Sequence, residues 1–551
     1  MLTGNEALAR ALSSARVRAA WSFPGSPLTR VEVLLEKKLV PVPHRFAVNE
    51  HVAVSMALGG ALLDQHNTCA LLKHVGVNVA LDALATFGLV NELRSAALIV
   101  EGVDCAPATS QNAQDNRAAM ASVARLPQLE AGSADEVYHL TRLAAQASLK
   151  LGMPLGVRVG ARSLDDKANV QEAPPGLPAG KPTFARATGP FVCTAATYRY
   201  HMDKRQRRLQ QLQPLLDALT VRTGDEGGKA VILAGHLGPR AHARSWARRL
   251  PTLRLPASWP LPRESVTKFP LARDEVLVLE EGEPFLEREI QALVHREGLA
   301  CKVRGAGGAR PLAIDDERLD VLLGRFGGRV RADIDPVVRE AAAWKAAAEL
   351  IAGLADDDGE PWPLFLARTR KQMKTFAPAD PRLTLLRSLR QLERPTLIVG
   401  DPGTTGLLGI PERLVDVKMH MGSAAPVAGA LAAAQEVEER AGTPLAVALI
   451  GDTNHYHSEL NGVLDNAIAR REVLHVLVVN RCSEMTAGVK TPYLADDALE
   501  AQLRSAGMHV ATASLDDPGL GAAVAYAASR PGPRALVCYG TPPATPAESD
   551  G

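Results

Sequence analysis

The sequence predicts an α/β protein of three domains, each built on a doubly wound, mainly parallel sheet. Short apolar runs typical of strands alternate with stretches of helical periodicity along most of the chain. The length of 551 residues suits about three ordinary domains. Hydrophobic residues make up 46% and charged residues 22%, the balance of a globular protein with large cores.

The first predicted domain spans residues 1–168, with strand-like runs at "RAAWSFPGSP", "CALLKHVG", "AALIVEG" and "PLGVRVGARS". Residues 169–185 are rich in Pro and Gly and indicate a linker. The second domain, 186–335, begins with the basic helical stretch "YHMDKRQRRLQQLQPLLDAL", which we interpret as a solvated helix face. Its strands follow at "KAVILAG", "EVLVLEEG" and "CKVRGAG".

An Ala-rich helical connector, 336–360, leads to the third predicted domain, 361–541. Its strands are "PTLIVGD", "PLAVALIGD", "LHVLVVN" and "RALVCYG". Residues 542–551 are rich in Pro, Ser and Ala and predict a disordered tail.

Charge and cysteine usage exclude several classes of function. The net charge of +1 gives no reason to expect a nucleic-acid or membrane partner. No run approaches membrane-spanning length and the N-terminus lacks the apolar core of a signal peptide, so we expect a cytoplasmic protein. The six cysteines form no CxxC pattern for zinc or iron–sulfur binding. They are Cys69, Cys105, Cys193, Cys301, Cys482 and Cys538.

Two polar residues follow successive apolar runs in the third domain. Asp452 follows "PLAVALIG" and Asn480 follows "VLHVLVV", 28 positions later, the length of one βαβ step. Leu460, Val463 and Leu464 belong to one apolar helix face between them, so both polar residues should lie at the carboxyl ends of parallel strands.

A carboxylate and an amide oxygen are ligands that Mg²⁺ prefers, and a backbone carbonyl near Cys482 could add a third. A helix beginning near Ser458 would direct its N-terminal amides at phosphate groups. Asp and Asn are also ordinary turn formers at strand ends. The spacing alone leaves both interpretations open.

Glu50 lies in the first turn of a predicted helix, "NEHVAVSMALGGALL". An acid in this position ordinarily stabilises the helix dipole. The functional alternative is a carboxylic acid that protonates the aminopyrimidine ring of thiamine diphosphate, the step that activates this cofactor.

Several strings together resemble the large (alpha) subunit of indolepyruvate:ferredoxin oxidoreductase, within the thiamine-diphosphate-dependent 2-oxoacid oxidoreductases. In the first domain they are "GNEALARA", "FPGSP", "NEHVAVSMALGGA", "KHVGVNVALD" and "SQNAQDNR". In the third they are "MGSA", "GDTNHYHSEL" and "NRCSEMTAG". The resemblance implies pyrimidine-binding, middle (transketolase-C-like) and diphosphate-binding domains, in that order.

The resemblance also implies roles for individual residues. Glu50, Lys73 and His74 would be catalytic, and Asp452, Asn480 and Cys482 would hold Mg²⁺. The implied cofactor-binding residues are Gly25, Asn78, Gln111, Gly403, Thr404, Gly422, Ser423, Gly451, Asp452, Thr453, His457 and Ser458.

The chain departs from the family at its cysteines. The family's Cys-Pro-Gly-Cys-Pro-His segment corresponds to "APADPR" at 377–382, Thr404 stands where a cysteine is usual, and no cysteine-rich C-terminal extension is seen. We therefore expect no iron–sulfur cluster in this chain. Electrons from an oxidative reaction would need another route.

The leading hypothesis is a thiamine-diphosphate- and Mg²⁺-dependent enzyme that decarboxylates an aryl or hydrophobic 2-oxo acid, of the indolepyruvate oxidoreductase type. Any electron transfer would use a small gamma-type or ferredoxin-like partner subunit, with coenzyme A as a candidate acyl acceptor. A homodimer is expected. The alternatives are a non-oxidative decarboxylase or carboligase, and a non-catalytic scaffold subunit with a degenerate thiamine fold.

Overall fold

The computed structural model describes residues 1–90, 92–104, 110, 112, 114–174, 180–184, 191–224, 228–240, 250–271, 273–305, 316–324, 336–354, 380–436, 443–486 and 488–540. These residues fall into two compact units. Unit 1 comprises residues 1–46, 67–179 and 202–357, and unit 2 comprises residues 47–66, 180–201 and 358–551. Cys105, Gln111 and residues 377–379 of "APADPR" lie outside the described residues.

Unit 1 contains a seven-stranded sheet in the order β12-β6-β7-β5-β4-β2-β3, parallel except where β12 meets β6. Its strands are β2 (Ala19–Ser22), β3 (His44–Phe46), β4 (Thr68–Lys73), β5 (Ala97–Val103), β6 (Gln128–Ala131), β7 (Leu155–Gly160) and β12 (Ala257–Trp259). Its helices are α1 (Gly4–Ser14), α2 (Thr29–Glu36), α4 (Val77–Leu89), α5 (Arg117–Ala119), α6 (Ala134–Leu151) and α7 (Ala161–Asp165). The short strands β1 (Leu2–Thr3) and β8 (Lys167–Ala168) pair antiparallel.

A second sheet in unit 1 has the order β14-β13-β10-β11-β9, with only β9 antiparallel to its neighbour. Its strands are β9 (Val221–Thr223), β10 (Lys229–Ala234), β11 (Thr252–Leu255), β13 (Glu275–Leu279) and β14 (Lys302–Arg304). The accompanying helices are α8 (Tyr198–Leu219, which starts in unit 2), α10 (Arg263–Leu271), α11 (Phe285–Arg296), α12 (Asp316–Gly324) and α13 (Pro336–Ala352).

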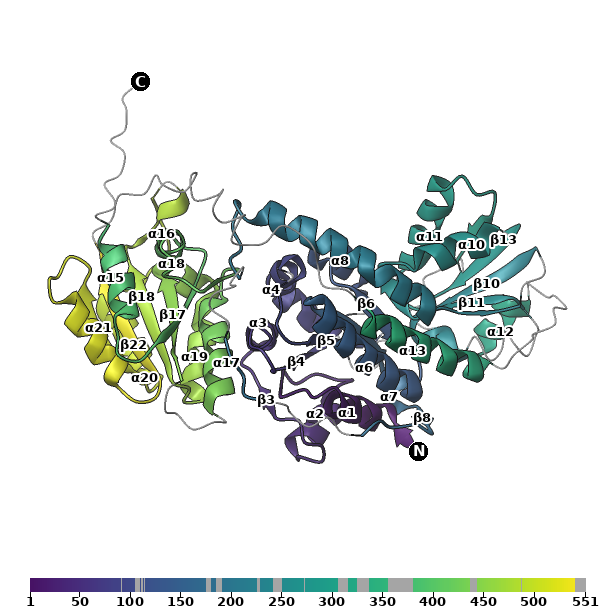
Figure 1. Cartoon of the computed structure of the whole chain (residues 1–551), viewed down its shortest axis with the longest axis horizontal. Coiled ribbons are helices and arrows are strands. Elements are labelled where there is room, and N and C mark those ends of the chain that lie inside the picture. The colour runs from purple at the N-terminus through teal and green to yellow at the C-terminus, as the bar shows by residue number, and fades with distance from the viewer. Residues whose placement is uncertain are drawn as a thin grey trace, which may run out of the picture. The chain divides into compact units, whose positions relative to one another are not determined.

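Unit 2 is built on a six-stranded, fully parallel sheet in the order β16-β15-β17-β18-β22-β21. Its strands are β15 (Thr396–Gly400), β16 (Val417–Lys418), β17 (Leu445–Gly451), β18 (Val473–Val479), β21 (His509–Ser514) and β22 (Arg534–Tyr539). Helices α15 (Pro381–Arg390) and α21 (Leu520–Ser529) cover one face, and α17 (Ala424–Glu436) and α19 (Leu460–Ile468) cover the other (Figure 1). The unit also contains α3 (Glu50–Gly60), α16 (Thr404–Gly409), α20 (Asp496–Ser505) and the hairpin of β19 (Cys482–Ser483) with β20 (Val489–Lys490).

These sheets confirm the predicted α/β class with three mainly parallel sheets. Strands β17 and β18 are buried almost throughout, as their continuous apolar runs predicted. The prediction of a helix start near Ser458 was wrong. Helical backbone begins at Asp452 with α18 (Asp452–Asn454) and continues through a π-type turn, His455–Glu459, into α19. The earlier start follows from Gly451, whose extended backbone makes it the N-cap of this helical segment without a side-chain cap.

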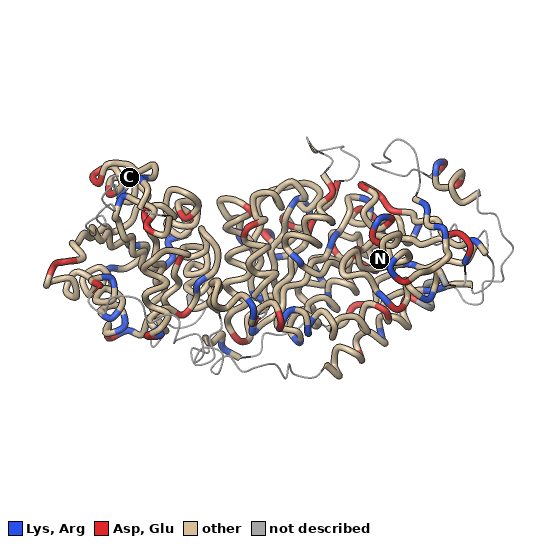
Figure 2. The backbone as a smooth tube through the Cα atoms, turned by 90° about the horizontal axis from the view of Figure 1, so that it is seen from above, with Lys and Arg blue, Asp and Glu red and all other residues tan. Residues whose placement is uncertain are grey.

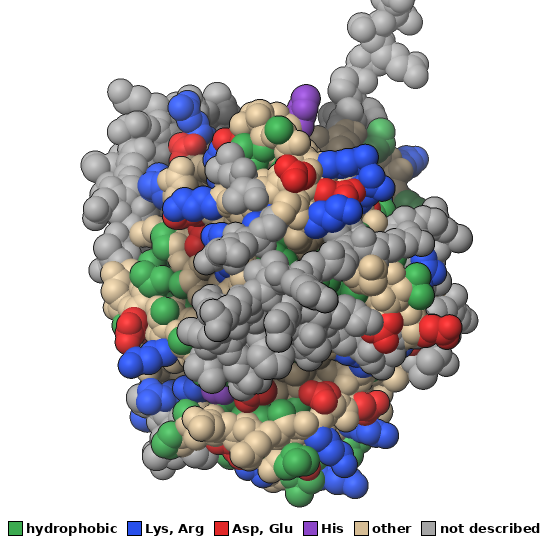
Figure 3. Space-filling view, turned by 90° about the vertical axis from the view of Figure 1, so that its right-hand side faces the viewer, with side chains coloured by type: hydrophobic (Ala, Val, Ile, Leu, Met, Phe, Trp, Pro, Cys, Tyr) green, Lys and Arg blue, Asp and Glu red, His purple; other side chains and the backbone are tan. Residues whose placement is uncertain are grey.

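Charged residues of both signs are interspersed along the chain (Figure 2). The face in Figure 3 likewise mixes basic, acidic and hydrophobic side chains. The basic stretch in α8 is not the freely solvated face that we predicted, because Arg205 and Arg208 are buried and Lys204 pairs with Glu92. Among the described residues, none of the helices combines the length and apolar character needed to span a bilayer.

Candidate functional site

A pocket of about 230 Å³ lies in unit 2 where strands β15, β17 and β18 end. The loops that follow these three strands supply most of its walls, as expected for ligand sites at the carboxyl ends of parallel strands. Its lining residues are Arg382, Asp401, Pro402, Gly403, Thr404, Thr405, Met421, Gly451, Asp452, Thr453, Asn454, Val478, Asn480, Cys482, Ser483, Glu484, Met485 and Thr486.

Asp452 lies directly after β17 and is buried. Its Oδ1 accepts a hydrogen bond from Thr453 N (2.7 Å), and its Oδ2 accepts from Asn480 N (3.1 Å) and Arg481 N (2.5 Å). Burial raises the pKa of this carboxyl group, although the hydrogen bonds from these backbone amides oppose the rise. The carboxylate therefore joins the ends of β17 and β18 and keeps lone pairs for a further ligand.

Asn480 and Cys482 follow β18 on the neighbouring wall. Asn480 Oδ1 accepts a weak hydrogen bond from Cys482 N (3.3 Å), and Thr453 Oγ1 donates to the Cys482 carbonyl (3.3 Å). A carboxylate, an amide oxygen and a backbone carbonyl thus line the same pocket. Hard oxygen donors of this kind fit Mg²⁺ together with the oxygens of a diphosphate.

A metal bound here would rely on those mixed oxygen donors. Within the described part of the chain, no cluster of three or more His, Cys, Asp or Glu side chains is arranged to hold a metal ion. Mg²⁺ keeps waters and substrate phosphates among its ligands and needs only one or two carboxylates. The donor set at Asp452 has that composition.

Asp401, after β15, is a pocket residue that the sequence interpretation missed. Its Oδ1 accepts from Gly403 N (2.9 Å), and its Oδ2 accepts from Gly451 N (2.7 Å) and Asn454 Nδ2 (2.6 Å). A side chain on Gly403 would approach Asp401 Oδ1 to 2.7 Å. Burial raises the pKa of Asp401, opposed by these hydrogen bonds and by the charge of Lys418. Asp401 therefore ties together the glycine-containing loops after β15 and β17.

Gly422 and Ser423 precede α17 and directly follow Met421, which lines the pocket. Gly422 has φ +87°, and a Cβ there would lie 2.7 Å from both His51 Nε2 and Ser458 Oγ. Ser423 Oγ donates to the His420 carbonyl (2.7 Å). The segment is thus fixed in a conformation that favours glycine and leaves no room for a side chain at 422.

Glu459 and His51, also missed from the sequence, hold this segment. Glu459 is fully buried and accepts from Ala424 N (2.7 Å) and Ala425 N (2.8 Å) at the start of α17. Burial raises its pKa to about 8. His51 Nε2 lies 3.1 Å from the Gly422 carbonyl and can donate to it.

Glu50 begins α3, next to His51, and is half-buried. Asn49 caps this helix by accepting from Val52 N (2.9 Å). Helix α3 packs closely on α17, because a side chain on Gly59 would meet Val427 Cα at 2.9 Å. Glu50 and Gly422 therefore lie on segments joined by the His51 contact and by helix packing within one unit.

Most of the predicted site residues gather in unit 2. Gly403, Thr404, Gly451, Asp452, Thr453, Asn480 and Cys482 line the pocket. Ser458 lies beside Gly422, while the exposed His457 bonds to Ser458 through Nδ1 (2.9 Å) and does not line the pocket.

The remaining predicted residues belong to unit 1. Gly25 packs against Lys73, whose Cβ would be 2.8 Å from a side chain at position 25. His74 is fully buried, with Nε2 2.9 Å from the Asn112 carbonyl. Asn78 and Gln114 exchange two side-chain hydrogen bonds of 2.8 Å. The four residues thus lie at or shortly after the carboxyl ends of β2 and β4.

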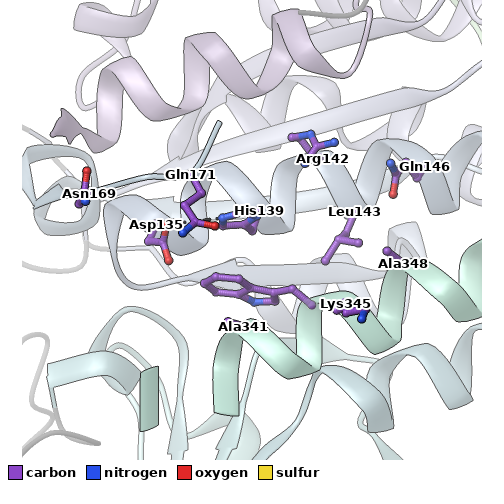
Figure 4. A pocket seen from close by; sticks show the side chains of 11 residues that line it. Asp135, His139, Arg142, Leu143, Gln146, Asn169, Gln171, Ala341, Lys345 and Ala348 are labelled. Atoms are coloured by element: carbon purple, nitrogen blue, oxygen red, sulfur yellow. Dashed lines mark ion pairs between the residues drawn. The ribbon is translucent and has the colours of Figure 1, made fainter. Parts of the chain in front are cut away.

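Another cavity, of about 420 Å³, lies between α6 and α13 in unit 1 (Figure 4). His139 pairs with Asp135 (3.5 Å) and stacks on Trp344, with ring centroids 4.3 Å apart. None of the predicted site residues that the structure describes lines this cavity. Its His139–Trp344 stack joins two helices and accounts for its aromatic wall.

Comparison with known proteins gives one consistent relationship. No protein-family model matches the chain. The chain is similar to indolepyruvate oxidoreductase subunit IorA of Methanothermobacter marburgensis, with 24% identity over 514 residues, 90% of this chain and 78% of that protein. The same-named subunit of Thermococcus kodakarensis is 26% identical over 527 residues, 89% of this chain and 76% of its own length. That of Archaeoglobus fulgidus is 29% identical over 304 residues, 53% and 48% of the two chains.

Two solved structures also align with the chain. Benzoylformate decarboxylase from Polynucleobacter necessarius has a TM-score of 0.49 and 14% identity, covering 98% of this chain and 99% of that one. A 2-oxoglutarate:ferredoxin oxidoreductase from Magnetococcus marinus has a TM-score of 0.45 and 14% identity, covering 59% and 64%. The IorA relatives confirm the resemblance predicted from the motifs.

Proposed function

We propose that this chain is a thiamine-diphosphate- and Mg²⁺-dependent enzyme that decarboxylates an aryl or hydrophobic 2-oxo acid. The observation that carries the proposal is the meeting of Asp452, Asn480 and the Cys482 carbonyl in one pocket at the ends of two parallel strands. The similarity to IorA subunits over 90% of the chain supports the choice of cofactor and substrate class.

The residues have distinct proposed roles. Asp452, Asn480 and the Cys482 carbonyl hold Mg²⁺, and the Gly403 and Gly451 loops approach the diphosphate closely because neither carries a side chain. Glu50 holds a proton at the aminopyrimidine ring. When bound, the cofactor supplies a thiazolium that accepts the electron pair left when CO₂ departs. Lys73, His74, Asn78 and Gln111 are proposed to face the substrate.

The fate of the electrons distinguishes two versions of this function. In the first, a partner subunit of gamma or ferredoxin type accepts them and coenzyme A takes the acyl group, within an assembly that contains a homodimer of this chain. In the second, the chain is a non-oxidative decarboxylase or carboligase. The second is favoured by the described end of the "APADPR" segment, where Asp380 and Arg382 form an ion pair (2.5 Å) in place of cysteine and histidine.

Anaerobic turnover of a panel of 2-oxo acids, with product mass spectrometry, tests the proposal. Each acid is supplied with thiamine diphosphate and Mg²⁺, with and without a viologen acceptor. CO₂ and aldehyde formed without acceptor would establish the non-oxidative version. Turnover that needs both acceptor and a co-purifying subunit would establish the oxidative one. A chain that never retains the cofactor would instead support a non-catalytic scaffold.

A further inference from the structure

Arg382 is held from two sides at the wall of the unit 2 pocket. Its Nε and Nη2 donate to the two oxygens of Asp380 (2.8 and 2.5 Å), and its Nη1 donates to Glu484 Oε2 (2.5 Å). The side chains of Arg382, Asp380 and Glu484 are 16%, 15% and 25% exposed, respectively. We call Asp380, Arg382 and Glu484 the clasp.

One end of the clasp is rigid. Asp380 is the N-cap of α15 and accepts from Arg382 N (2.9 Å), so the acid and the guanidinium are fixed by the first turn of a helix. Helix α15 is anchored in turn by Leu385, Leu386 and Leu389, which are fully buried in the core of the unit. The guanidinium therefore has a defined position, and little entropy is lost when it binds a second carboxylate.

The other end of the clasp belongs to a lightly held segment. Residues 482–486 follow Asn480, and Glu484, Met485 and Thr486 all line the pocket. Met485 is 58% exposed, and the β19–β20 hairpin contributes only two residue pairs. The ion pair from Glu484 to Arg382 thus adds a side-chain restraint to the hydrogen bonds that hold Cys482 and Ser483.

The clasp also separates two cavities. A second cavity, of about 300 Å³, is lined by Asp380, Pro381, Leu515, Asp516 and Gly540 together with Arg382, Val478, Asn480 and Glu484. The last four residues line the 230 Å³ pocket as well. Arg382 and Glu484 therefore form part of the partition between the two cavities.

We propose that the clasp controls how long the cofactor stays bound, by holding segment 482–486 against the diphosphate pocket and closing its side wall. This inference rests on the proposed function, because it takes the ligand to be thiamine diphosphate with Mg²⁺. It assigns Arg382, at the position of the family's histidine, as a positioning residue that acts through Glu484. In this chain the ion pair of Arg382 with Glu484 anchors segment 482–486. Arg382 lies where the resemblance implies a cysteine-containing segment.

The rate of thiamine diphosphate release from the Mg²⁺-loaded full chain tests this inference. Labelled cofactor is bound, excess unlabelled cofactor is added, and retained label is followed with time. We expect Arg382→Ala and Glu484→Gln to release it about tenfold faster, and Arg382→Lys to lie between these and the unchanged chain. Raised ionic strength should speed release more from the unchanged chain than from Arg382→Ala, because only the unchanged chain keeps the clasp ion pair to be screened.

Arg387→Ala is the matched control. Arg387 also lies on α15 and binds Glu412 with two hydrogen bonds, of 2.7 and 3.1 Å, but this pair is 45% and 42% exposed and lies away from the pocket. Its release rate should equal that of the unchanged chain. Equal rates for all variants, with cofactor still bound by the unchanged chain, would overturn the clasp alone. An unchanged chain that binds no cofactor would overturn the proposed function and the clasp together.

Glu484→Gln controls for a folding defect, because it keeps the shape of the Glu484 side chain and removes only its charge. If Arg382→Ala melts at the temperature of the unchanged chain but releases cofactor faster, the effect is local to the pocket. Faster release seen only in variants with a lowered melting temperature would overturn the clasp in favour of a general loss of structure.

Discussion

Two groups of buried acids, one in each unit, differ in the groups that bind their carboxylates. In unit 1, Arg117 binds Asp115 (2.6 Å) and Glu280 (2.7 Å), and Arg158 binds Glu130 (3.1 Å) and Asp115 (3.3 Å). In unit 2, the pocket acids Asp401 and Asp452 and the neighbouring Glu459 accept hydrogen bonds mainly from backbone amides. The first group is paired with arginine side chains, whereas the second is held mainly by backbone amides.

The pKa of Asp115 shifts in the opposite direction to those of the two pocket acids, although burial also raises the pKa of Glu280 in the first group. Burial works to raise the pKa of Asp115, but the charges of Arg158 and Arg117 outweigh it and the net shift is downward. Burial raises the pKa of both Asp401 and Asp452. Backbone amides orient a carboxylate without cancelling its charge, so the unit 2 acids gain from a bound cation. Acids paired with arginine indicate a structural network, and acids held by strand-end amides indicate a binding site.

Asp452→Ala should have the largest effect, because it removes the single carboxylate proposed to bind Mg²⁺. We expect the affinity for thiamine diphosphate in the presence of Mg²⁺ to fall by roughly 1000-fold or more. Fluorescence titration measures it, with the exposed Asp497→Ala as control. An unchanged affinity for thiamine diphosphate would show that Asp452 only caps the end of its strand.

Glu50→Gln tests the acid at the start of α3, which belongs to neither group of buried acids. Gln cannot deliver a proton, so turnover should fall by about 100- to 1000-fold, while cofactor affinity changes little. Steady-state rates and a cofactor titration on the same preparation measure the two quantities. Full activity in this variant would show that Glu50 only stabilises the start of its helix.

Arg158→Met removes one of the two arginines that pair with the buried acids of unit 1. Glu101, Asp115, Glu130 and Glu280 would then share one guanidinium in a buried setting, and we expect a loss of about 3 kcal/mol in the free energy of unfolding. Chemical denaturation measures it, with Arg162→Met, at a side chain 53% exposed, as control. A loss as small as that of the control would mean that this network is not structural.

Asp401→Asn tests the link between two loops. The new amide nitrogen would face Gly451 N and Asn454 Nδ2, both donors, so we expect about tenfold weaker cofactor binding. Adding Asn454→Asp restores one donor–acceptor pair and should recover part of the affinity. No recovery in the double variant would count against this contact as the cause.

Glu459→Gln should have the smallest effect, seen as a pH dependence. The folded pKa is about 8 against an ordinary 4.5, so the folded state binds the extra proton between these values. Its contribution to stability is full below about pH 4.5 and is lost as pH rises towards about 8. The variant should remove a decline of about 1 kcal/mol in unfolding free energy between pH 7 and pH 8. A decline that persists would assign it to another group.

The sequence predicted the parts of the fold that depend on local pattern. The apolar runs before Asp452 and Asn480 specify two adjacent buried strands, and this was enough to place both residues at one pocket. The prediction of a helix near Ser458 failed because Gly451, with its extended backbone, acts as the N-cap, so that helical backbone begins at the next residue, Asp452.

Asp401, Glu459 and His51 could not be found from spacing. Each acts through contacts to residues distant in the chain, such as Asp401 to Gly451 and His51 to Gly422. An acid after a strand or a histidine in a helix is ordinary, and its partners are set by tertiary packing. Asp401 belongs to "VGDPG" and Glu459 to "HSEL", which lie in or beside the quoted motifs. This nearness to the motifs was the signal that the sequence offered for the two acids.

The most direct test of the central claim is an equilibrium titration of the unchanged full chain with thiamine diphosphate, in Mg²⁺ and in EDTA. We predict saturable binding of one cofactor per chain in Mg²⁺, lost in EDTA and in Asp452→Ala. Absence of binding in Mg²⁺, or equal binding in all three conditions, would contradict the assignment of the strand-end acids to a metal–diphosphate site.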